Sequence, residues 1–155
     1  MPIETLYDTS SLPPCDLVGI LTAEMQLYGI INNCPLRRRA VPFYSMDLYA
    51  NNNRRLRVYI RDGDLNIVDL TGATCLFTVK MLKADAVLTI QKSTAVPAEG
   101  QIGSADQGEC FFYILPADTA SLAIAQYVYD VSVELADGNQ YTTVEGVLNL
   151  LQPVA

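Results

Sequence analysis

The sequence contains no histidine. This absence excludes a Ser-His-Asp or Cys-His catalytic arrangement within the chain and removes the side chain that most often serves as a general base. Zinc sites that combine histidine with cysteine are excluded for the same reason. The glycine-rich phosphate loops of nucleotide-binding proteins are absent as well. The sequence therefore predicts a protein that is not an enzyme and that holds no metal and no cofactor.

Long apolar runs and tryptophan are also missing. No run reaches the roughly 18 apolar residues of a membrane span, and the N-terminus lacks the basic and apolar regions of a secretory signal. We therefore expect a chain made in the cytosol, with no membrane partner. A carbohydrate-binding sandwich needs exposed aromatic rings in a groove, and the absence of tryptophan, with only four phenylalanines, disfavours it.

The four cysteines are far apart and form no CxxC pair: Cys15, Cys34, Cys75 and Cys110. Cytosolic chemistry disfavours disulfides, and free cysteine is commonly buried as a small apolar side chain. A metal site built from all four thiolates is the alternative. The spacing favours reduced, metal-free thiols.

Basic residues are few, with ten Lys and Arg against seventeen Asp and Glu and a net charge of -7. Nucleic-acid binding needs clustered basic residues, so this balance disfavours it. The charge is uneven: residues 1–62 hold seven Arg and six acidic residues, whereas residues 63–155 hold three Lys and eleven acidic residues. The first segment can approach acidic surfaces that the second would repel.

The first fifty residues contain five of the eight prolines, which forbid a continuous helix or a central strand. Between Pro14 and Pro35, five apolar residues have the spacing of a short helix: Leu17, Ile20, Leu21, Met25 and Tyr28. So many apolar residues among prolines need a surface to lie on. We predict that residues 1–50 form an extended, partly helical N-terminal arm for inter-subunit contacts, and that deleting them leaves a folded domain over residues 51–155.

Three consecutive arginines lie in this arm: Arg37, Arg38 and Arg39. Four more follow at positions 54, 55, 57 and 61 on a predicted strand. Guanidinium groups pair bidentately with carboxylates, so we expect the triplet to dock on an acidic partner. A solvated turn after Pro35 is the alternative.

From residue 54 the sequence alternates with a period of two, which is typical of strands with one buried face. Strands are predicted over residues 54–61, 73–82, 87–91, 109–115, 126–136 and 141–151, with a short helix within residues 116–122. Such strands, with frequent turn signals, favour an all-β immunoglobulin-like antiparallel sandwich, and a small barrel is the alternative. Asp62, Asp64 and Asp69 are candidates for a calcium loop, although their spacing is not that of an EF-hand and equally suits turns.

Five short motifs together resemble the immunoglobulin-like modules of tailed-phage structural proteins, in particular the N-terminal domain of phage baseplate upper proteins: Asp69–Ala73, Asp118–Ala120, Tyr127–Val131, Asp137–Gly138 and Glu145–Gly146. The resemblance covers about residues 54 to 152, and none of its residues is catalytic. It implies a non-enzymatic component of the virion.

We expect a capsid cement or decoration protein whose arm binds and stabilises neighbouring major capsid subunits, because the sequence ends directly after the last predicted strand and leaves no chain to hold a fibre. A tail, neck or baseplate component, such as a fibre adaptor, is the alternative. A carbohydrate-binding attachment module is the third hypothesis. The expected partners are the major capsid protein or other virion subunits, further copies of the chain itself, and no nucleic acid.

Overall fold

The computed structural model is built of two facing β-sheets, which confirms the all-β class. It describes residues 24–31, 41–85 and 87–154. The four-stranded sheet runs, in order, β1 (Glu24–Ile31), β3 (Arg54–Asp62), β7 (Glu109–Ile114) and β6 (Gly100–Ile102). The five-stranded sheet runs β2 (Phe43–Tyr49), β9 (Gln140–Leu151), β8 (Gln126–Glu134), β4 (Thr74–Lys80) and β5 (Ile90–Ser93). Two short helical turns, η2 (Ala105–Gln107) and α2 (Pro116–Thr119), connect strands.

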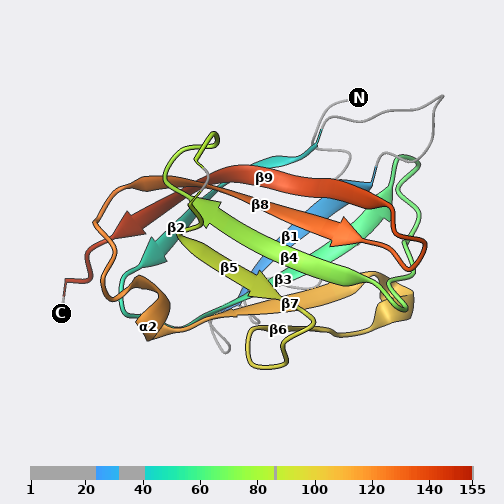
Figure 1. Cartoon of the computed structure of the whole chain (residues 1–155), viewed down its shortest axis with the longest axis horizontal. Coiled ribbons are helices and arrows are strands. Elements are labelled where there is room, and N and C mark those ends of the chain that lie inside the picture. The colour runs from blue at the N-terminus through green and yellow to red at the C-terminus, as the bar shows by residue number, and fades with distance from the viewer. Residues whose placement is uncertain (1–23, 32–40, 86, 155) are drawn as a thin grey trace.

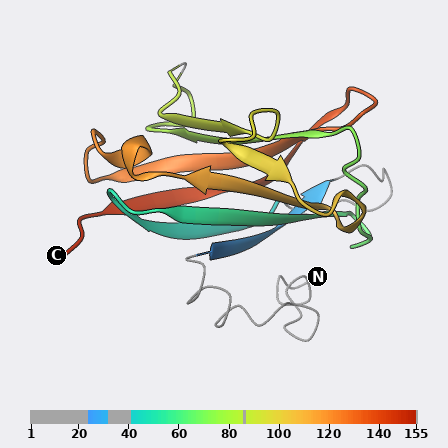
Figure 2. The same ribbon diagram turned by 90° about the horizontal axis from the view of Figure 1, so that it is seen from below.

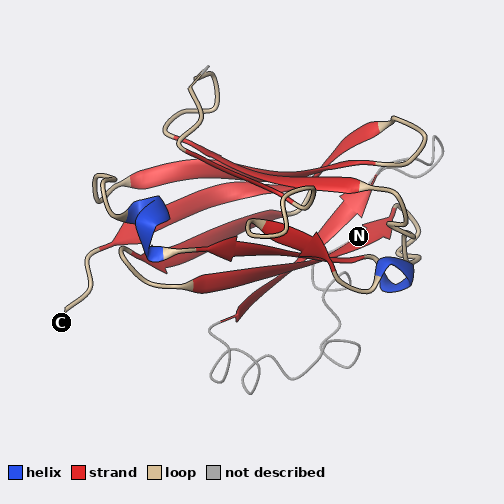
Figure 3. Cartoon of the chain, turned by 60° about the horizontal axis from the view of Figure 1, so that its bottom comes forward, coloured by secondary structure: helices blue, strands red, loops and turns tan. Residues whose placement is uncertain are grey.

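The two sheets present their outer faces on opposite sides of the molecule. Figure 1 looks onto the five-stranded sheet, and Figure 2, from below, shows β6, β7, β3 and β1 side by side. Strands account for most of the described chain, as the colouring in Figure 3 makes clear. Among the described residues, no helix is long and apolar enough to cross a membrane.

The period-two alternation explains which strand residues form the core. On β3 the inward residues Leu56, Val58 and Ile60 are fully buried, while their neighbours are half-buried on the outer face. The inward residues of β4 and β8 are buried in the same way and join them in one cluster. Side chains at alternate positions point to the same face of a strand, so a short apolar alternation is enough to build this core.

Most of the predicted strands are confirmed, with differences at their ends. The prediction of a strand through residue 82 is wrong, because β4 ends at Lys80 and Met81 is 44% exposed in the following loop. Strand β5 begins at Ile90, three residues later than predicted, and the short β6 within residues 93–108 was not predicted. The positive φ of Gly138, +89°, confirms the predicted turn between β8 and β9.

The first fifty residues differ most from the prediction. Residues 24–31 form β1, parallel to β3, and residues 43–49 form β2, parallel to β9. The helix predicted through Met25 and Tyr28 is therefore wrong for this segment, and the boundary at residue 50 does not mark where the sandwich begins. Leu27 and Ile31 fill the inner face of the sheet beside β3, so long-range pairing overrides the local helical spacing.

Three close contacts fasten these N-terminal strands to the rest of the sandwich. The Tyr44 hydroxyl donates to the backbone carbonyl of Tyr28 at 3.2 Å, which ties β2 to the edge of β1. A Cβ at Gly29 would lie 2.8 Å from the Cβ of Thr143, and a Cβ at Gly146 would overlap the Tyr44 carbonyl oxygen. Glycine is needed at both positions because another backbone or side chain approaches closely.

Candidate functional site

The outer face of the four-stranded sheet gathers arginine and aromatic side chains. The outward positions of β3 carry Arg55, Arg57, Tyr59 and Arg61, opposite the buried alternation of the same strand. The paired positions of the neighbouring strands add three aromatic residues. We call this set the arginine face: Tyr28, Arg55, Arg57, Tyr59, Arg61, Phe111 and Tyr113.

Aromatic rings hold the guanidinium groups of this face. The Cζ atoms of Arg55 and Arg57 lie 5.1 and 4.6 Å from the centroid of the Phe111 ring. Such cation–π contacts contribute about 0.5–1 kcal/mol each at exposed sites. The Arg57 Nη1 also donates to the Tyr59 hydroxyl at 3.2 Å, and the Tyr59 ring stacks on that of Tyr28 with centroids 5.1 Å apart. These contacts therefore fix the positions of the Arg55 and Arg57 side chains on the face.

The charge of this face is opposite to that of the whole chain. All four arginines in the described segments lie on β3, at positions 54, 55, 57 and 61, in a protein of net charge -7. The guanidinium group is planar, always charged and suited to carboxylates. A positive face on an acidic protein orients it toward an acidic surface. Guanidinium groups arranged in this way can bind carboxylates.

The predicted site residues fall in two groups. Met25 packs against the core from the inner side of β1, whereas Tyr28 belongs to the arginine face. The remaining six lie outside the described residues: Leu17, Ile20, Leu21, Arg37, Arg38 and Arg39. Phe111 was not predicted as part of a site, and the signal for it is its place opposite Arg57 in the β3–β7 register.

The aspartates considered for calcium are used in turns. The Asp62 carboxylate accepts backbone N–H bonds from Asp64 and Asn66 at 2.8 and 2.9 Å. The Asp69 carboxylate accepts the hydroxyl and the backbone N–H of Thr71, and these bonds lower its pKa. Within the described segments, no group of three His, Cys, Asp or Glu side chains could hold a metal ion. The geometry thus assigns Asp62 and Asp69 to turn formation.

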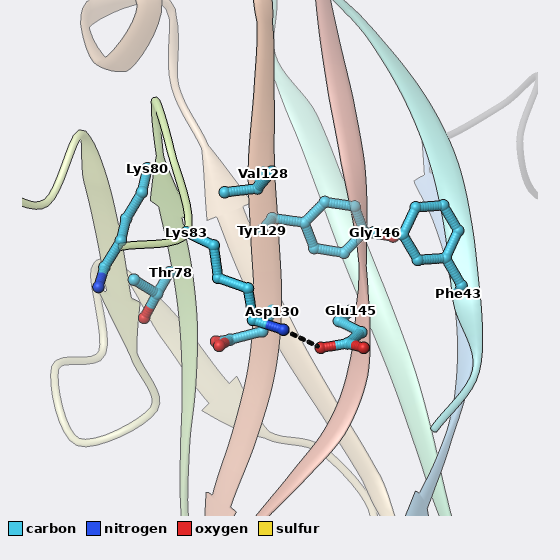
Figure 4. Close-up of a pocket in the computed structure, with 9 residues that line it drawn as sticks. All are labelled: Phe43, Thr78, Lys80, Lys83, Val128, Tyr129, Asp130, Glu145 and Gly146. Carbon is cyan, nitrogen blue, oxygen red and sulfur yellow. Dashed lines mark hydrogen bonds and ion pairs between the residues drawn. The ribbon is translucent and has the colours of Figure 1, made fainter. Parts of the chain in front are cut away.

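A shallow groove lies on the opposite side of the molecule, on the outer face of the five-stranded sheet (Figure 4). Its volume is about 140 Å³. Lys83 reaches over from the β4–β5 loop, and its amine lies 3.5 Å from the Glu145 carboxylate. Phe43, which is 61% exposed, forms the far wall. The groove therefore presents an aromatic ring beside charges of both signs.

Two carboxylates are cross-strand neighbours in this groove. Asp130 on β8 pairs in register with Glu145 on β9. Burial raises the pKa of Asp130, and the Glu145 carboxylate raises it further, while Lys80 and Lys83 lower it. The nearby amines partly offset the carboxylates, as expected for a mixed-charge surface. The chain has no histidine, so this pair cannot belong to a carboxylate–histidine relay within the chain.

The raised pKa of Asp130 predicts a pH-dependent effect of its removal. Because the folded state favours the protonated carboxyl, this group stabilises the fold at acid pH and loses that contribution as the pH rises through its folded pKa. Asp130→Asn, which stays neutral, is therefore expected to raise the melting temperature modestly at pH 7. Thermal unfolding at pH 7 and pH 3 tests this: the gain should disappear at pH 3, and a loss of stability at pH 7 would contradict it.

Neither a protein-family model nor a characterised protein matches the sequence. Among solved structures, the N-terminal domain of phage TP901-1 ORF48 aligns at 9% identity with a TM-score of 0.45, over 81% of this chain and 98% of that one. A multicopper oxidase aligns at 9% identity with a TM-score of 0.33, over 83% of this chain and 44% of the oxidase. Both likenesses are too distant to support an argument about function.

Proposed function

We propose that the chain is a non-enzymatic structural subunit of a tailed-phage tail or baseplate, built on an immunoglobulin-like sandwich. In this proposal the arginine face binds an acidic surface of a neighbouring virion subunit. The arginine face carries the proposal, because three of the four arginines in the described segments lie together on it, in a protein of net charge -7. The sequence motifs that resemble phage baseplate modules are the reason for proposing a phage tail or baseplate.

The preference for the tail over the capsid follows from the N-terminal strands. The capsid hypothesis required a long arm whose apolar residues grip neighbouring subunits. Residues 24–31 and 43–49 instead pair within the two sheets, where Leu27, Ile31, Met46 and Leu48 are buried. These side chains are not available to a neighbour, which removes much of the reason for a cement role. The capsid alternative is one outcome of the fractionation experiment.

The location of the chain in the virion is the first test. Particles from an infected host would be separated into heads and tails, and the chain quantified in each fraction by mass spectrometry. We expect it in the tail fraction. Recovery in the head fraction would favour decoration of the capsid and overturn the tail proposal, and absence from purified particles would overturn both.

The role of the arginine face is tested by Arg57→Glu. A charge pair that is desolvated in an interface costs about 2–5 kcal/mol when one partner is lost, which corresponds to a loss of affinity of roughly 30-fold or more. We expect the variant to be depleted from particles in a complementation assay. Because Arg57 also contacts Phe111 and Tyr59, the melting temperature of the variant must be measured together with its incorporation.

The matched control is Lys83→Glu, the same change of charge on the opposite sheet. The Lys83 side chain is 85% exposed, so water screens the repulsion that a glutamate at this position would feel from Glu145. The change in folding stability should stay within about 1 kcal/mol, and incorporation should stay near the wild-type level. Equal incorporation of the Arg57 and Lys83 variants would show that the arginine face does not attach the subunit.

A further inference from the structure

Two cysteines that the sequence separates widely meet in the core. Cys75 lies on β4 of the five-stranded sheet, and Cys110 lies on β7 of the four-stranded sheet. Both are free thiols with 0% exposure. Each is on the inward face of its strand, so the two side chains point into the same core from opposite sides.

The residues that follow them fix the alignment of the two strands. Phe77 and Phe112, each two positions after one of the cysteines, face one another with ring centroids 5.9 Å apart. Side chains two positions apart lie on the same face of a strand, so Cys75 and Cys110 lie next to this pair of phenylalanine rings in the core. The two thiols are within hydrogen-bonding reach, and this bond, together with burial, raises the pKa of Cys110.

We propose that Cys75 and Cys110 form a disulfide that joins the two sheets when the protein is exposed to a disulfide oxidant. One thiolate attacks the oxidant, releases one thiol and forms a mixed disulfide. The second thiolate then displaces the other half. In total two protein thiols lose two protons and two electrons, and one small disulfide, such as oxidised glutathione, is reduced to two thiols.

The core position sets the conditions for this reaction. The thiolate is the attacking species, and burial with a raised pKa keeps Cys110 protonated in the folded state. The bond should therefore form during folding or in transiently opened molecules, and slowly in the native protein. Once formed, it is equally protected from reductants. The expectation of four reduced thiols then holds only for protein that has not met an oxidant.

The bond closes a loop from residue 75 to residue 110 that contains β5, β6 and η2. Cross-linking a loop of this size stabilises a protein mainly by restricting its unfolded chain. We expect the oxidised protein to melt about 5–15 °C above the reduced protein, given the usual stabilisation by a disulfide and the size of this domain. The gain should be absent from Cys75→Ala.

The experiment refolds the full chain in glutathione redox buffer, blocks remaining thiols and maps the digest by mass spectrometry without reduction. The expected result is a linked pair of peptides containing Cys75 and Cys110, which reductant separates. Recovery of both cysteines as blocked thiols, or linked to Cys15 or Cys34, would overturn the proposal. The peptide map uses the wild-type chain, so it decides the question even if Cys75→Ala fails to fold.

Discussion

A chain that begins at residue 51 is expected not to fold. The deletion removes β1 and β2, which pair with β3 and β9 at the edges of the two sheets. It also removes buried apolar side chains, among them Leu27, Ile31, Met46 and Leu48. At about 1.5–3 kcal/mol each, their loss is comparable with the about 5–15 kcal/mol total stability of a typical domain.

Circular dichroism and thermal unfolding would measure this effect. We expect the chain of residues 51–155 to give no cooperative transition. The matched comparison is a chain that begins at residue 24, because it retains every strand that the structure describes. A cooperative β-rich transition for residues 51–155 would restore the predicted domain boundary and contradict the importance of the parallel edge strands.

The strands that could be predicted from the sequence are those whose structure is encoded locally. Strands β3, β4, β8 and β9 could be predicted because alternation and turn residues lie within each segment. Asp137–Gly138 and the positive φ of Gly72, +74°, are local signals of the same kind. Each of these signals is satisfied by the residues next to it, so the rest of the chain is not needed to recognise it.

Strand β1 could not be predicted from such local signals. Its apolar residues have helical spacing in part, and prolines surround it in the sequence. Its conformation is decided by pairing with β3, whose residues lie some thirty positions later, and by the Tyr44 hydroxyl. A single sequence does not carry that pairing in its local pattern, since parallel partners can be far apart along the chain.

The candidate site was predictable in part for the same reason. The arginines of β3 are visible in the sequence as alternating residues, so their common face could be inferred. Their aromatic support could not, because Phe111 reaches Arg55 and Arg57 only through the β3–β7 register. The contact of Cys75 with Cys110 depends likewise on how two sheets face each other, which spacing along the chain does not encode.

Asp118→Ala is expected to cost about 3–5 kcal/mol of unfolding free energy, because it leaves a buried ammonium group without its carboxylate. The Lys92 Nζ lies 2.7 Å from the Asp118 carboxylate, and the two side chains are 7% and 21% exposed. Asp118 also accepts the backbone N–H of Leu115 at the start of α2. The substitution therefore removes an ion pair and a helix cap together. Urea denaturation monitored by circular dichroism measures the loss.

The exposed pair of Lys83 and Glu145 provides the control for this loss. Their side chains are 85% and 37% exposed, so Lys83→Ala should cost less than about 1 kcal/mol. A second variant separates burial from attraction: replacing Lys92 by Met and Asp118 by Leu together removes both charges, and such apolar replacement is often close to neutral. We therefore expect the double variant to be more stable than Asp118→Ala. If the single and double variants lose equal stability, the effect comes from the lost cap at Leu115 and not from the unpaired ammonium group.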